Sequence, residues 1–231
     1  MRECLSLTDF NPLLQYVERL KPDNVLDIGC GCGSFTIELA RHCKQITAID
    51  ISEPLLERCR KEHDRPNIVY RCMDGRQLDF PDGHFDWALC RESLHHVYDW
   101  QVVVDEMLRV AASGILIEEP LDDPRSDAKR NTMQEQRLFL ELQAEVGYPH
   151  YAHVTPDQLT GYLRKQGIRF ESEIIRSDEA VTFEEYFEAW AFFAKKSTRE
   201  HYWLERLADF RRDLGDGQLC ENDILFVTAC K

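Results

Sequence analysis

The chain has few basic residues for its length. It contains 28 lysine and arginine residues against 42 aspartate and glutamate residues, a formal net charge of −14. An acidic surface repels a phosphate backbone, which argues against a general nucleic-acid-binding protein. The sequence also lacks the run of about 18 apolar residues that a membrane span requires. Residues 1–20 lack the basic, then apolar, then small pattern of a secretory signal. We therefore expect a cytoplasmic protein without a membrane segment.

Metal-binding cysteine patterns are absent as well. The nine cysteines are scattered, and Cys30 and Cys32 form a Cys-x-Cys pair. Zinc and redox motifs typically use Cys-x-x-Cys spacing instead. We expect no metal site, and thiols that act as small apolar side chains in a reducing compartment.

The chain does contain enough apolar residues for a core, since hydrophobic residues make up 43% of its 231 residues. This length fits one domain with insertions or two small domains. Strand-like and helical patterns alternate from Asn24 to Pro120, which is typical of a parallel sheet covered on both faces. Strands are expected at 24–28, 46–49, 67–72, 85–90 and 115–117, and helices at 10–20, 34–42, 53–62 and 101–110. The fold class is therefore α/β, a Rossmann-like doubly wound sheet.

The pattern changes after Pro120. Helices are expected at 131–146, 156–165 and across an aromatic-rich stretch at 182–214, with strands at 170–175 and 223–230. These two strands bring the sheet to seven, the last one antiparallel. We interpret residues 1–231 as a single domain in which insertions at about 122–150 and 182–215 form a helical cap. Tyr186, Trp190 and Phe193 recur at helical spacing, so they either pack the two helical blocks together or line the roof of a pocket.

A glycine-rich turn carries the clearest functional signal. The strand that ends at Ile28 runs into Gly29, Gly31 and Gly33 and then into a helix. Asp50 ends the next strand, where a carboxylate can bind two ribose hydroxyls. Asp27 would repel a pyrophosphate beside this turn but suits a positively charged ligand. S-adenosylmethionine has a ribose, an amino group and a sulfonium, and no phosphate.

The ordered motifs resemble those of class I S-adenosylmethionine-dependent methyltransferases. The resemblance rests on LDIGCGCG at 26–33, IDIS at 49–52, MDG at 73–75, FDWALC at 85–90 and SLHHV at 93–97. It covers residues 20 to 120 and is greatest to the small-molecule enzymes of ubiquinone and menaquinone biosynthesis. It implies methyl transfer from S-adenosylmethionine to an O, N, S or C nucleophile of a small acceptor.

The resemblance also implies roles for individual residues. Asp27 and Gly29 would lie near the methionine end of the cofactor, and Gly31 and Gly33 would shape the turn. Asp50 would bind the ribose. The rest of the implied cofactor site is Ile51 on the adenine face, Asp74 and Gly75 at the adenine amino group and ring, and Cys90 and Arg91 beside the methionine part.

No general base is singled out by spacing. The candidates are His95, His96, Glu118, His150 and Tyr151. Each also has a structural interpretation as a packed, capping or solvated side chain. Because side chains alternate along a strand, at most one of Glu118 and Glu119 points into the substrate site.

Two other classes of function stay open at this stage. One is an NAD(P)-dependent oxidoreductase, which Asp27 and the serine at position 34 disfavour. The other is a non-catalytic module that binds a partner protein through the aromatic cap. The expected partner is a small-molecule methyl acceptor, not nucleic acid or a membrane, and the expected state is a monomer or homodimer.

Overall fold

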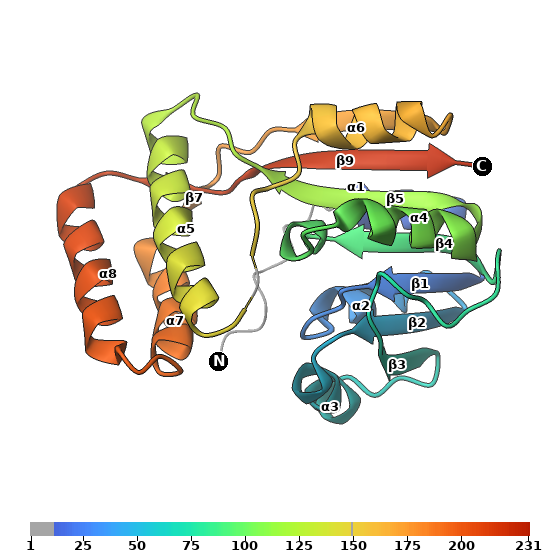
Figure 1. The fold of residues 1–231 in the computed structure, drawn as a ribbon, viewed down its shortest axis with the longest axis horizontal. Coiled ribbons are helices and arrows are strands. Elements are labelled where there is room, and N and C mark those ends of the chain that lie inside the picture. Colours follow the sequence, from blue (N-terminus) through green and yellow to red (C-terminus); the bar gives the residue numbers. More distant parts are fainter. Residues whose placement is uncertain (1–11, 149) are drawn as a thin grey trace. The chain divides into compact units, whose positions relative to one another are not determined.

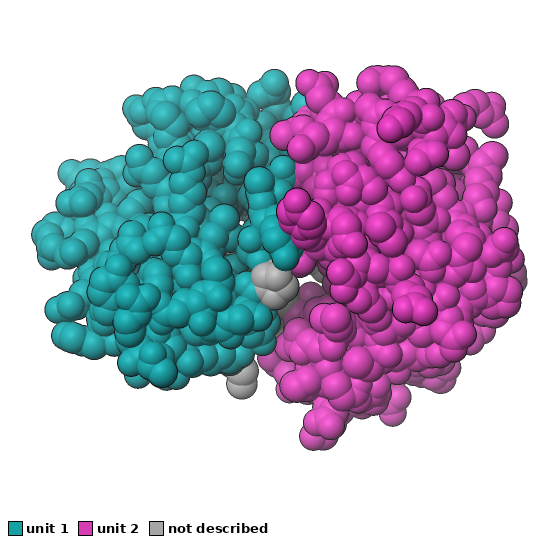
Figure 2. All heavy atoms as spheres, in the orientation of Figure 1, with its two compact units in different colours: residues 1–2, 120–153, 174–224 teal, residues 3–119, 154–173, 225–231 magenta. Residues whose placement is uncertain are grey.

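The computed structural model describes residues 12–148 and 150–231, without the side chains of residues 185, 186, 188 and 189. The described chain divides into two compact units (Figure 2). Unit 1 comprises 120–153 and 174–224. Unit 2 comprises the residues up to Glu119 together with 154–173 and 225–231. Among the described residues, no helix is long and apolar enough to cross a membrane. The expectation for Phe10 at the start of the first helix lies outside the described residues.

A seven-stranded sheet forms the core of the fold, in the order β3-β2-β1-β4-β5-β9-β6. Strands β1 to β5 run parallel, with register pairs such as Asp27 opposite Leu89 and Arg91 opposite Glu118. Figure 1 shows β9 pointing the opposite way from β5. The strands are β1 Asn24–Ile28, β2 Gln45–Asp50, β3 Ile68–Cys72, β4 Phe85–Arg91, β5 Ala111–Leu121, β6 Arg169–Ile175 and β9 Asp223–Cys230. The doubly wound, mixed seven-stranded sheet expected from the sequence is confirmed.

Helices cover both faces of this sheet because its central strands are apolar on both faces. In Figure 1, α4 and α6 lie on the face toward the viewer, and α1 and α2 lie behind. Tyr162 of α6 ties these two front helices together: its ring lies 5.5 Å from that of Trp100, and its hydroxyl donates to Asp105. The helices of unit 2 are α1 Pro12–Leu20, α2 Ser34–Leu39, α3 Glu53–Glu62, the 3₁₀ helix η1 Leu94–His96, α4 Trp100–Val110 and α6 Pro156–Lys165.

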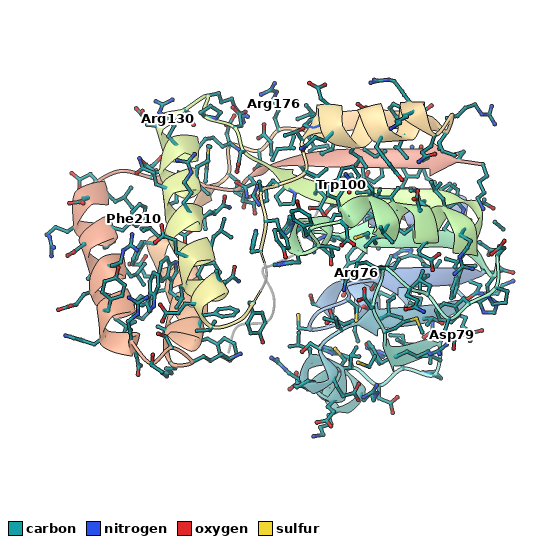
Figure 3. All side chains as sticks on the ribbon, viewed as in Figure 1. Arg76, Asp79, Trp100, Arg130, Arg176 and Phe210 are labelled. Atoms are coloured by element: carbon teal, nitrogen blue, oxygen red, sulfur yellow. The ribbon has the colours of Figure 1, made fainter. Side chains whose placement is uncertain are left out.

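Unit 1 is built mainly from three helices, α5 Asp127–Glu145, α7 Phe183–Ala194 and α8 Glu200–Leu214, with a short pair of strands, β7 Ala180–Val181 and β8 Leu219–Cys220. Two helices occupy the helical stretch expected at 182–214, because the chain turns between Ala194 and Glu200 and folds α8 back onto α7. Trp190 is fully buried with Leu142 and Trp203, and Figure 3 shows Phe210 of the same unit on α8.

This packing decides between the two interpretations of the aromatic stripe for Trp190. It packs the helical blocks together, and Phe193 packs against the same core. The side chain of Tyr186 lies outside the described residues. That unit 1 forms a cap over the site stays a prediction.

Within the described residues, seven cysteines carry free thiols, as expected: Cys30, Cys43, Cys59, Cys72, Cys90, Cys220 and Cys230. Cys32 is disulfide-bonded, so the expectation is wrong for this residue.

Candidate active site and cofactor site

The glycine turn leaves β1 through backbone conformations that favour glycine. Gly29, Gly31 and Gly33 have φ angles of 73°, 53° and 78°, all in the left-handed region. A Cβ at Gly29 would lie 2.0 Å from the Ser93 hydroxyl oxygen. Gly29 therefore allows the segment after β4 to approach the turn after β1, at the edge of the sheet where its parallel strands end.

Asp27 lies inside β1 and is 2% exposed. Its carboxylate accepts a hydrogen bond from the Thr36 hydroxyl at 2.6 Å. Burial raises the pKa of Asp27 to about 6, and the Thr36 hydrogen bond and the charge of Arg91 oppose this rise. Asp27 thus links β1 to α2, and it still places a carboxyl group beneath the turn.

Asp50 is oriented by two backbone amides. Oδ2 accepts from the Gly31 N–H at 2.9 Å, and Oδ1 accepts from the Ser52 N–H at 2.8 Å. Each carboxylate oxygen can accept a further hydrogen bond, so the geometry suits a pair of ribose hydroxyls. Ile51 follows with 70% of its surface exposed. Because this apolar side chain is exposed to solvent at the end of a strand, an aromatic ring can pack on it.

Asp74 already has a side-chain partner, Arg76, that the sequence does not predict. Its carboxylate accepts three side-chain hydrogen bonds from Arg76, two from Nε and one from Nη2, and this pairing lowers the pKa of Asp74. Arg76, labelled in Figure 3, also reaches Asp99 at 3.4 Å. Gly75 packs on Ile28, where a Cβ would come within 3.1 Å of the methyl carbon. An adenine amino group at Asp74 would therefore share the carboxylate with Arg76.

Cys90 and Arg91 end β4. Cys90 is buried, and burial raises the pKa of its thiol well above the usual value. Arg91 Nε donates to Glu118 at 2.7 Å and Nη2 donates to Glu92 at 2.8 Å. The guanidinium also lies over the Phe35 ring, 5.2 Å from its centroid.

His95 and Glu119 form a buried pair that spacing along the sequence does not reveal. His95 Nδ1 lies 2.7 Å from Glu119 Oε2, and the two side chains are 7% and 0% exposed. Glu119 Oε1 accepts from the backbone N–H groups of Ser93 and Leu94. These donors and His95 lower the pKa of Glu119 although burial raises it. A carboxylate only accepts, so Nδ1 is the donor and Nε2 is the basic nitrogen of neutral His95.

The five candidates for a general base do not all gather in one unit. His95, His96 and Glu118 belong to unit 2, and His150 and Tyr151 belong to unit 1. The His96 ring lies 4.4 Å from that of His95, and His150 Nδ1 lies 3.1 Å from the Gln143 side-chain oxygen. Glu118 contacts Arg91 and Glu119 contacts His95, so the two side chains have different partners, as the alternation along β5 predicts. Both side chains are buried.

Comparison with known proteins shows which enzymes this chain is similar to. The methyltransferase domain family matches residues 26–117. The ubiquinone biosynthesis O-methyltransferase of Coxiella burnetii is 28% identical over 69% of this chain and 70% of its own length. The 27-O-demethylrifamycin SV methyltransferase of Amycolatopsis mediterranei is 33% identical over 65% of this chain and 55% of its own.

A solved structure shows the same fold. The N-methyltransferase NodS of Bradyrhizobium japonicum, in complex with S-adenosylhomocysteine, aligns with a TM-score of 0.56 and 18% identity, over 96% of this chain and 89% of its own. Together these matches indicate a methyltransferase enzyme that uses S-adenosylmethionine as its methyl donor. It is an enzyme, which decides against the oxidoreductase and the non-catalytic module.

Proposed function

We propose that this enzyme methylates a hydroxyl oxygen of a small-molecule acceptor, with His95 as the general base. The observation that carries the proposal is the buried contact between His95 and Glu119. A hydroxyl is a weak nucleophile until it loses its proton, whereas an amine attacks through its own lone pair. A histidine held in one tautomer by a carboxylate is suited to take that proton. Both sequence relatives described above are named as acting on oxygen.

The residues at the edge of the sheet fit the cofactor. Asp50 has acceptor positions left for the ribose, Ile51 offers an exposed apolar surface, and Asp27 supplies negative charge near the turn. We assign Gly29, Gly31 and Gly33 to the turn around the cofactor, Asp74 and Gly75 to the adenine end, and Cys90 and Arg91 to the methionine end. When bound, S-adenosylmethionine supplies a methyl group on a positively charged sulfonium.

The chain itself then has two tasks in the reaction. The glycine turn and Asp50 hold the cofactor in a fixed position, which reduces the entropic cost of bringing two reactants together. His95 Nε2 takes the proton of the acceptor hydroxyl as the oxygen attacks, and Glu119 stabilises the imidazolium that forms. Glu119 is a positioning residue, because it acts through His95.

The test is methyl transfer from labelled S-adenosylmethionine to a panel of phenols, alcohols, amines and thiols. With a hydroxyl acceptor, His95→Gln should lower kcat by about 10²- to 10⁴-fold. Affinity for S-adenosylhomocysteine should not change. His201→Gln is the matched control, because His201 is 87% exposed and pairs with Glu205 on the surface of α8. Transfer to amines only, or full turnover of a hydroxyl by His95→Gln, would contradict the proposal.

A further inference from the structure

Glu118 is a buried carboxylate with one oxygen unsatisfied. It lies in β5 opposite Arg91 of β4, and its side chain is 2% exposed. Oε1 accepts from Arg91 Nε at 2.7 Å. Oε2 is buried and has no hydrogen-bond partner within residues 12–148 and 150–231. The backbone N–H of Leu13 at the start of α1 also acts on this carboxylate and favours its charged form. An unpaired buried carboxylate oxygen is costly, so Oε2 still has room for one well-aligned donor.

Around Glu118, carboxyl groups outnumber the positively charged groups. Arg91 is shared between Glu118 and Glu92, and its charge also acts on Asp27. Three carboxyl groups thus surround one guanidinium. Burial raises the pKa of Glu118, the charge of Glu92 adds to this rise, and Arg91 opposes it. A ligand that brings both an N–H donor and a positive charge would relieve both deficits.

The place of Glu118 in the sheet limits which ligand group can reach it. Asp50, the proposed ribose ligand, ends β2, and the strand order runs from β2 through β1 and β4 to β5. Glu118 therefore lies on the other side of β1 from the ribose position. Rossmann-like sheets hold ligands across this edge. The methionine part of the cofactor, which extends from the ribose, is the part that reaches toward β4 and β5.

We propose that Glu118 binds the α-ammonium group of the methionine part of S-adenosylmethionine through Oε2, while Oε1 keeps Arg91 in place. The ammonium carries three N–H donors and one positive charge, so it can both donate to Oε2 and reduce the excess of negative charge around Glu118. The sulfonium has no donor and does not satisfy Oε2. This role replaces general-base catalysis for Glu118, because one of its oxygens already holds a guanidinium. The assignment rests on the cofactor and not on the proposed oxygen acceptor.

Titration calorimetry with two ligands tests this assignment. S-adenosylhomocysteine carries the amino-acid part, and 5′-methylthioadenosine lacks it. Glu118→Gln should weaken S-adenosylhomocysteine binding by about 10- to 100-fold, the range expected for a hydrogen bond between charged groups. Binding of 5′-methylthioadenosine should stay within about two-fold of wild type, which also shows that the variant is folded.

Glu92→Gln is the matched control. It removes the same charge and also contacts Arg91, but Glu92 is 39% exposed, so both ligands should bind this variant nearly as well as wild type. An analogue of S-adenosylhomocysteine without the amino group should bind wild type and Glu118→Gln equally. Unchanged S-adenosylhomocysteine affinity in Glu118→Gln, or an equal loss for 5′-methylthioadenosine, would overturn the assignment. These measurements need no acceptor, so they stand or fall separately from the choice of methylated atom.

Discussion

Asp27 shows how one buried side chain in this enzyme serves both the fold and the cofactor. From the sequence, Asp27 is expected to place a carboxylate beside a positively charged ligand. The structure shows a hydrogen bond from Thr36 of α2 and a pKa raised to about 6 by burial. A positive ligand nearby would favour the charged carboxylate, so the two roles are compatible.

Asp50→Ala tests the ribose contact at the same scale. Loss of two hydrogen bonds to a charged group should cost about 2–3 kcal/mol of binding free energy for S-adenosylhomocysteine, or roughly 30- to 150-fold in affinity. Titration calorimetry on the variant measures this loss of affinity for S-adenosylhomocysteine. Asp79→Ala is the control, because the side chain of Asp79, labelled in Figure 3, is 92% exposed. Unchanged affinity for Asp50→Ala would show that Asp50 does not bind the ribose.

At the scale of elements, the three helices of unit 1 are held by an aromatic core that contains one acidic group. Glu135 of α5 is 1% exposed and accepts a hydrogen bond from the Trp190 indole of α7. Burial raises the pKa of Glu135 to about 7. The protonated form is therefore the more stable one in this core, and ionisation at neutral pH works against folding.

Glu135→Gln should consequently stabilise the helices at neutral pH. In wild type, the stabilising contribution of Glu135 to the free energy of unfolding is fully present below the unfolded pKa of about 4.5. This contribution is lost as the pH rises to about 7. Glutamine keeps an acceptor for Trp190 and cannot ionise, so the variant should gain about 2–3 kcal/mol at pH 8 relative to pH 4.5. Denaturant unfolding of both proteins at the two pH values measures this difference.

The control for this experiment is Glu141→Gln on the same helix. The side chain of Glu141 is 54% exposed, and it pairs with Arg206 at the surface, so its removal should change little. If wild type and Glu135→Gln lose stability in parallel between pH 4.5 and 8, the carboxyl of Glu135 does not titrate as described.

The net charge is a property of the whole molecule. A net charge of −14 disfavours contact with a phosphate backbone, most strongly at low salt, where the charges are least screened. We predict no sub-micromolar binding to single- or double-stranded RNA or DNA, and no affinity that weakens steeply with salt. Fluorescence anisotropy with labelled oligonucleotides between about 50 and 200 mM salt checks this. Tight, salt-sensitive binding would show that a local basic surface outweighs the net charge.

The amino-acid sequence determined the parallel half of this protein almost completely. The run from Val25 to Gly33 predicts a strand, a turn and a helix by local rules, because apolar periodicity and glycine placement act over a few residues. Helix α3 at Glu53–Glu62 and helix α6 at Pro156–Lys165 have the expected bounds. Asp50 follows from the same local logic, since it ends a strand that the pattern already identifies.

Tertiary structure decided the contacts between residues far apart in the chain. Local patterns do not show that Glu119 meets His95, 24 positions away, or that Glu118 meets Arg91. These contacts follow from the pairing of β4 with β5, which sets Arg91 opposite Glu118 and brings two strand ends to one edge. The turn between α7 and α8 has the same origin. Helical periodicity runs through 182–214, but burying Trp190 against Trp203 requires the chain to fold back.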